Sequence, residues 1–115
     1  MKIVDYNTFI SMPKGTLYSN YAPCYMSGLK VKDDTINEGK DWFYYDMLDN
    51  PDQHYKDEYL QYFDTIAKME HGESIPADFY ILERDGMFDY ERCFVIYEHK
   101  DIKEFIEKLK ELIHE

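Results

Sequence analysis

The sequence predicts a single α+β domain, residues 1–115, in which an antiparallel sheet of four or five strands is covered by two main helices, at about 51–71 and 102–113. Three observations predict this fold class. Two runs rich in β-branched and aromatic residues, at 78–84 and 92–98, are bounded by charge as strands are. A strong helix start lies at Asn50, and an amphipathic segment begins at Asp101.

The first third of the chain predicts a short helix and two strands. Asp5 can cap a helix over 6–11, and the Pro-Lys-Gly sequence at 13–15 predicts a turn after it. Strands are expected at 16–21 and 25–32, where apolar and polar residues alternate. Gly28 in the second strand indicates a bulge or bend of the kind that curls small sheets. Both an open sheet and a barrel-like sheet are therefore considered.

The polar residues 33–41 predict a loop. Its oxygen-bearing side chains begin like those of a calcium loop, but Glu38 stands where Gly is needed and Tyr44 where Glu is needed, so no metal is expected. The next segment, 42–48, is ambiguous. Its aromatic residues favour a strand, whereas Asp41 as a cap favours a helical turn, and the strand is preferred.

A long helix is predicted from Pro51 to about residue 71. Asn50 is a suitable N-cap, Pro51 suits the first helical position, and Gln53 completes a capping box. Gly72 is a suitable end. The apolar positions recur at helical spacing and are expected to face the core: Tyr55, Tyr59, Tyr62, Phe63, Ile66 and Ala67.

The two apolar runs at 78–84 and 92–98 are predicted to be neighbouring strands in the centre of the sheet, because neither alternates cleanly. A loop from Asp85 to Glu91 would then pair Leu82 with Phe94. After them, Asp101 is expected to cap the last helix. Its core-facing stripe comprises Ile102, Phe105, Ile106, Leu109, Leu112 and Ile113.

The chain carries a net charge of −11, unevenly distributed. Residues 1–32 have a net charge of +3, whereas residues 33–64 hold ten acidic and two basic residues. This argues against direct binding to nucleic acid or an anionic membrane, and it suits a protein partner with a basic surface. No long apolar run and no signal peptide are found, so a cytoplasmic protein with free Cys24 and Cys93 is expected.

No catalytic motif is found, so an enzyme is not expected. The sequence contains no phosphate-binding loop, dinucleotide fingerprint, nucleophile elbow or zinc-protease motif. The four His residues are scattered, and Cys93 lies within an apolar strand without a neighbouring base. We therefore expect neither catalytic residues nor a cofactor.

Two features remain as candidate partner-binding sites. One is the aromatic loop tip with Met87, Phe88 and Tyr90, since exposed aromatic side chains often anchor interfaces. The other is an acidic block whose carboxylates could imitate a phosphate backbone. The acidic block comprises Asp33, Asp34, Glu38, Asp41, Asp46, Asp49, Asp52, Asp57, Glu58 and Asp64.

Residues 7–18, with a short helix, a Pro-x-Gly-Thr turn and an aromatic strand, resemble the start of small uncharacterised phage and prophage proteins of Gram-positive bacteria. Small, acidic, Tyr-rich phage proteins often resemble inhibitors of host defence, such as anti-CRISPR proteins. The resemblance implies this context, with the cytoplasm of a bacterial host cell as the location, and carries no catalytic residue over.

The leading hypothesis is therefore a non-enzymatic acidic interaction protein, in the form of a phage-encoded inhibitor that occupies a basic nucleic-acid-binding surface. The alternative is a small-molecule binder such as a signalling-nucleotide sponge, because surplus Tyr residues and Trp42 could stack a base. The candidate phosphate contacts for this alternative are Lys14, Lys30, Lys32, Arg84 and Arg92. The oligomeric state is left open, with a homodimer as one option.

Overall fold

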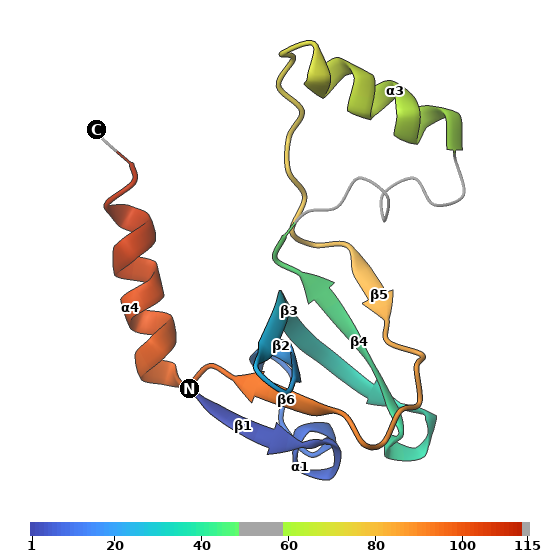
Figure 1. Ribbon diagram of the computed structural model, residues 1–115, viewed down its shortest axis with the longest axis vertical. Coiled ribbons are helices and arrows are strands. Elements are labelled where there is room, and N and C mark those ends of the chain that lie inside the picture. Colours follow the sequence, from blue (N-terminus) through green and yellow to red (C-terminus); the bar gives the residue numbers. More distant parts are fainter. Residues whose placement is uncertain (49–58, 114–115) are drawn as a thin grey trace.

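The computed structural model describes residues 1–48 and 59–113, and it shows an α+β fold built on one antiparallel sheet (Figure 1). Six strands pair in the order β1-β6-β2-β3-β4-β5, and the sheet is not closed into a barrel. The strands are β1 (Lys2–Asp5), β2 (Leu17–Ala22), β3 (Tyr25–Ile36), β4 (Asp41–Asp46), β5 (Leu82–Arg84) and β6 (Cys93–Ile96). The helices are α1 (Tyr6–Ile10), the short 3-10 helix η1 (Asn37–Gly39), α3 (Tyr59–Glu70) and α4 (His99–Lys110).

The predicted class is confirmed, and the strands expected at 16–21, 25–32 and 42–48 are present as β2, β3 and β4, which pair antiparallel in chain order. The pairing of β2 with β3 shifts register between Tyr18 and Asn20, opposite Gly28, whose φ is +75°. The Ser19 hydroxyl donates to the Gly28 carbonyl at 2.6 Å and holds this irregularity in place. Residues 42–46 lie in β4, so the strand interpretation of this segment is confirmed.

The core lies on one face of the sheet under the short helix α1. Asp5 caps α1 by accepting a hydrogen bond from the Thr8 amide at 2.8 Å, as predicted. Phe9 of α1 is fully buried and stacks on Phe94 of β6 at 4.1 Å between ring centroids. Trp42 of β4 packs edge-on against Phe9 at 4.9 Å. The first thirteen residues therefore supply the cover of the sheet.

Several strand predictions are wrong. The expected loop at 33–41 is shorter, because β3 continues to Ile36 and only η1 and Lys40 separate it from β4. A strand that the sequence did not predict, β1, pairs with β6. The pairing of Leu82 with Phe94 does not form, since Leu82 pairs with Tyr45 of β4 and Phe94 lies between Val4 and Asn20. As a result β6 is central, as predicted, but the prediction of a central strand at 78–84 is wrong, since this segment contributes only the three-residue edge strand β5.

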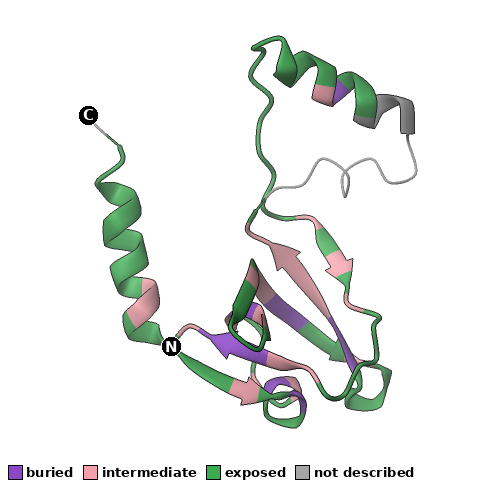
Figure 2. Cartoon of the chain, viewed as in Figure 1, coloured by how far each residue is buried: buried purple, intermediate pink, exposed green. Residues whose placement is uncertain are grey.

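The two long helices do not cover the sheet as predicted. Figures 1 and 2 show α3 and α4 extending away from the strands with mostly exposed residues. On α3, Phe63 and Ala67 are exposed and Ile66 is half-buried, whereas Tyr55 and the side chains of Tyr59 and Tyr62 lie outside the described residues. The predicted start of this helix at Pro51 also lies outside them. Burial of the core rings by α1 explains how the sheet folds without either long helix.

The start of α4 differs by three residues from the prediction. Glu98, rather than Asp101, is the N-cap, and Asp101 occupies the third helical position of a capping box. The Glu98 amide donates to Asp101 Oδ2 at 2.9 Å. Of the stripe expected to face the core, only Ile102 is half-buried, and the other five side chains are exposed.

Candidate interaction site

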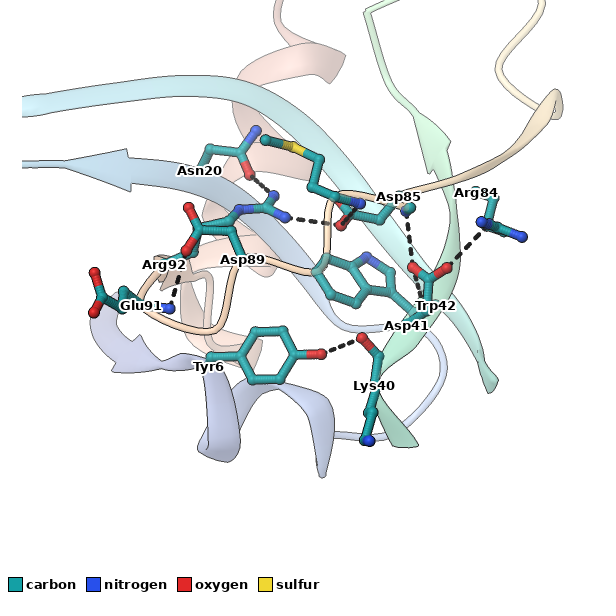
Figure 3. Close-up of polar contacts among 12 residues, drawn as sticks. Tyr6, Asn20, Lys40, Asp41, Trp42, Arg84, Asp85, Asp89, Glu91 and Arg92 are labelled. Atoms are coloured by element: carbon teal, nitrogen blue, oxygen red, sulfur yellow. Dashed lines mark hydrogen bonds and ion pairs between the residues drawn. The ribbon is translucent and has the colours of Figure 1, made fainter. Parts of the chain in front are cut away.

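The segment 85–92, which we call the strap, crosses from β5 at the sheet edge to β6 in its interior. It runs beside η1 and the start of β4 and lies over the core rings (Figures 1 and 3). The Asp85 amide donates to the Trp42 carbonyl at 3.0 Å, which fixes the start of the strap on β4. The strap contains the loop tip that the sequence marked as a candidate.

Asp41 anchors the strap from a fully buried position. Its Oδ1 accepts from the amides of Trp42 and Gly86, each at 2.9 Å, and its Oδ2 lies 3.0 Å from Arg84 Nε. Asn37 of η1 donates to Oδ2 at 3.4 Å. Because a buried carboxylate needs several donors, this single side chain ties η1, β4, β5 and the strap together (Figure 3).

Arg92 anchors the other end of the strap. Its guanidinium donates to Asp85 Oδ2 at 2.8 Å and to Asn20 Oδ1 at 3.0 Å. The same group lies 5.0 Å from the Phe94 ring centroid and 5.4 Å from that of Trp42. Both members of the Asp85–Arg92 ion pair are largely buried, so neither charge is well solvated if the other is removed.

Tyr6 of α1 supports the middle of the strap. Its hydroxyl donates to the Lys40 carbonyl, and its ring meets Tyr90 edge-on at 5.1 Å between centroids (Figure 3). The pKa of Tyr6 is raised, mainly by burial and to a smaller extent by nearby Tyr90. The raised pKa keeps the hydroxyl protonated, so it can donate a hydrogen bond. Tyr90 is therefore held on its inner side while its outer side faces solvent.

The tip of the strap presents apolar side chains outward. Met87 is 64% exposed, Phe88 40% and Tyr90 52%. The tip is shaped by short local bonds, with the Glu91 amide donating to Asp89 Oδ1 at 3.1 Å and Phe88 in a left-handed conformation, φ +51°. A loop fixed in this way loses little conformational entropy when it binds, which favours recognition.

Exposed carboxylates surround this tip. Asp89 and Glu91 belong to the strap, and Glu38 belongs to η1, which the Asn37–Asp41–Gly86 bonds hold beside it. Two cations are near: Lys40 is exposed, and Arg84 is engaged with Asp41. We call the set Glu38, Met87, Phe88, Asp89, Tyr90 and Glu91 the tip surface. It combines apolar anchors with negative charge.

The described members of the acidic block do not gather on one surface. Asp41 is fully buried, and Asp33 is buried and paired with Lys14 at 3.5 Å. Asp34 is exposed and also faces Lys14, at 3.7 Å, and Asp46 is half-buried. Asp64 is exposed on α3, away from the sheet (Figure 1). The remaining members lie outside the described residues: Asp49, Asp52, Asp57 and Glu58.

The basic residues considered for a nucleotide are engaged within the protein. Lys32 is buried and donates to Thr35 Oγ1 at 2.6 Å, and Lys30 Nζ lies 4.4 Å over the Tyr44 ring. Burial lowers the pKa of both amines. The other three pair with carboxylates: Lys14 with Asp33 and Asp34, Arg84 with Asp41, and Arg92 with Asp85.

Comparison with known proteins finds no relative: no protein-family model, curated protein or solved structure matches the chain. Within residues 1–48 and 59–113, no group of three or more His, Cys, Asp or Glu side chains is arranged to hold a metal ion. The helices of the same described part are too short or too polar to span a membrane. The tip surface is therefore interpreted from its own chemistry.

Proposed function

We propose that this chain is a non-enzymatic interaction protein that binds a protein partner with a basic surface through the tip surface. The observation that carries the proposal is the anchored strap, which holds Met87, Phe88 and Tyr90 exposed beside Glu38, Asp89 and Glu91. Aromatic side chains on a rigid loop act as anchors in a partner's pockets, and surrounding carboxylates steer a basic surface toward them.

The proposal extends to the class of partner. The net charge of −11 supports a partner whose basic surface ordinarily binds nucleic acid. The resemblance of residues 7–18 to phage proteins supports an inhibitor of a host defence system, acting in the bacterial cytoplasm. In this role the exposed carboxylates of the chain occupy the positions of phosphates.

The geometry favours a protein partner over a nucleotide. A nucleotide sponge needs basic groups that converge on a phosphate beside an aromatic ring. Here Lys32 is buried, Lys30 lies on Tyr44, and Arg92 is enclosed between Asp85 and Asn20. Freeing any of them for a ligand would break an existing contact, whereas the tip surface is already exposed.

Affinity capture from a bacterial lysate with the full chain, followed by mass spectrometry, tests the proposal. We expect the wild type to retain a protein with a basic surface. We expect the double variant Phe88→Ala/Tyr90→Ala to retain at least roughly tenfold less of this protein. Tyr80→Ala is the matched control, since Tyr80 is aromatic, 82% exposed and precedes β5 outside the strap.

Circular dichroism of each variant shows whether the fold is kept, which matters because Tyr90 packs on Tyr6. Equal capture by the wild type and by a folded Phe88→Ala/Tyr90→Ala variant would contradict the role of the tip. Loss of capture in Tyr80→Ala alone would place the binding surface elsewhere.

A further inference from the structure

The end of the chain carries an apolar stripe that the sheet does not use. Phe105, Ile106 and Leu109 of α4 are 39%, 45% and 45% exposed, and Leu112 and Ile113 just beyond it are 64% and 67% exposed. Their spacing places them on one side of the helix. Isolated exposed apolar residues are ordinary, but a continuous stripe of five marks a contact surface.

The stripe is held firmly at its base. The Met1 amine lies 2.7 Å from Asp101 Oδ2 and 3.5 Å from Glu98 Oε1, so the chain start braces the first turn of α4. The helix then extends away from the sheet (Figure 1). The capping box and these ion pairs thus fix the first turn of α4, from which the stripe extends.

At this base the stripe continues into the sheet. Phe105 lines a pocket of about 390 Å³ together with Leu17, Leu29 and Tyr97. Leu17 and Leu29 precede Tyr18 and Lys30 on their strands, so they lie on the face opposite the α1 core. Phe105, at the base of the stripe, and this sheet face thus form two walls of one groove, which we call the α4 groove and which Met1, Asp101 and Glu104 also line.

The charge pattern identifies a second copy of the chain as the occupant. Residues 98–111 contain five acidic residues and four Lys, a net charge of −1, whereas the whole chain carries −11. Two copies repel each other over most of their surfaces, but hardly at α4. A basic partner of the kind proposed for the tip surface would find no excess negative charge here.

The amount of apolar surface also fits self-association. Five side chains that each expose about half of their surface offer on the order of 500 Å² per copy, against roughly 800 Å² per partner in a standard interface. The walls of the groove add to this area. A two-fold pairing buries the same stripe on both copies at once, which is how most homodimers are built.

We propose that two copies of this protein form a two-fold dimer in which the α4 stripe of each copy lies in the α4 groove of the other. The charged side of α4 takes no part, since Lys110 pairs with Glu107 at 3.2 Å and Lys108 faces Glu111 at 3.8 Å within the helix. The dimer leaves the strap, at another corner of the sheet, free for a partner (Figure 1).

Sedimentation equilibrium and light scattering of the full chain over a wide concentration range test the proposal. We expect the mass of a dimer for the wild type and roughly tenfold or greater weakening of association in Leu109→Glu. Lys103→Gln, on the charged side of the same helix, is the matched control, because it changes the net charge by the same amount as Leu109→Glu, and it should remain dimeric. Circular dichroism reports whether α4 stays helical in each variant.

A wild type that is monomeric at every concentration would overturn the proposal. A folded Leu109→Glu variant that stays fully dimeric would overturn it as well, because another surface would then hold the dimer. The Phe88→Ala/Tyr90→Ala variant should stay dimeric, so failure of partner capture and failure of dimerisation are measured separately.

Discussion

Asp41 illustrates how one side chain can position a functional loop. Its carboxylate is fully buried and accepts from the Gly86 amide of the strap while it faces Arg84 on the neighbouring strand. The sequence suggested an exposed role for it, because it stands in an acidic block. Its partners Arg84 and Gly86 lie more than forty positions away, so no local pattern could reveal its burial.

We predict that Asp41→Ala lowers the free energy of unfolding by about 3 kcal/mol, because it leaves buried amides without an acceptor and Arg84 without its ion pair. Urea denaturation followed by circular dichroism measures the loss. Asp34→Ala, at an exposed carboxylate two residues before the end of β3, should change stability by less than about 0.5 kcal/mol. Equal effects of both substitutions would contradict the anchoring role.

Lys32 carries a stability cost that depends on pH. Burial lowers its pKa below the ordinary 10.5, so at pH 7 the folded protein holds a charged amine in a poorly solvated position. As pH rises from the lowered pKa toward 10.5, the unfolded chain binds more protons than the folded one at this site. The contribution of Lys32 to stability therefore increases with pH over this range.

We predict that Lys32→Met is more stable than the wild type at pH 7, by roughly 1 kcal/mol or more, and that the gap narrows as pH rises toward 10.5. Urea denaturation at a series of pH values checks this. Lys14→Met should instead be less stable than the wild type, with a difference that is constant up to about pH 10.5 and lost above it, because the charge of Asp33 raises the pKa of Lys14. A gap for Lys32→Met that widens with pH would refute the assignment.

At the scale of elements, the strap is anchored at both of its ends. Asp85 holds Arg92 and also accepts from the Met87 amide at 3.3 Å, whereas Asp89 accepts only the local bond from Glu91. The two carboxylates lie four residues apart in one loop, yet the first is buried and the second exposed. Asp85 therefore anchors the strap, whereas Asp89 gives it an exposed negative charge.

We predict that Asp85→Ala speeds hydrogen exchange of the Gly86 and Met87 amides by roughly tenfold or more, because the strap then opens locally without global unfolding. Asp89→Ala should leave these amides unchanged. Exchange measured by NMR at residue resolution distinguishes the two. Unchanged protection in Asp85→Ala would show that Asp41 alone holds the strap.

The elements that could be predicted are those set by neighbouring residues. Asp5 and Thr8 define α1, and the alternation of β2 and β3 shows in their sequence. The order of strands could not be predicted, because β6 pairs with β1 and β2 across more than seventy residues. The α4 stripe was expected to pack on the sheet but is exposed. Helical spacing shows which residues share a face, but it does not show what covers that face.

At the scale of the whole molecule, net charge and aromatic anchors are expected to contribute differently to binding. The charge of −11 acts at long range and is screened by salt, whereas Phe88 and Tyr90 act by contact. The tip surface combines both. The relative weight of charge and aromatic contact separates two forms of the proposed binding: phosphate imitation, and an apolar contact through the tip.

We predict that the affinity for the captured partner falls roughly tenfold or more between low and high salt, because in the proposed complex carboxylates replace phosphates on a basic surface. Calorimetric titration at several salt concentrations measures the slope. Dimerisation through the nearly neutral α4 groove should respond only weakly to salt and is the internal control. Salt-insensitive partner binding would rule out phosphate imitation while leaving an apolar contact through the tip.

The strand order has a consequence for how the chain reaches its native state. β2, β3 and β4 can pair as soon as they leave the ribosome, but β1 joins the sheet only through β6, which follows all the other strands in the sequence. Until β6 is made, β1 has no partner strand, and Phe9 can contact Tyr18 and Trp42 but lacks the stacked ring of Phe94. Such late, long-range closure slows folding and leaves strand edges open meanwhile. Nascent chains are therefore expected to need protection from aggregation until the last strand is made.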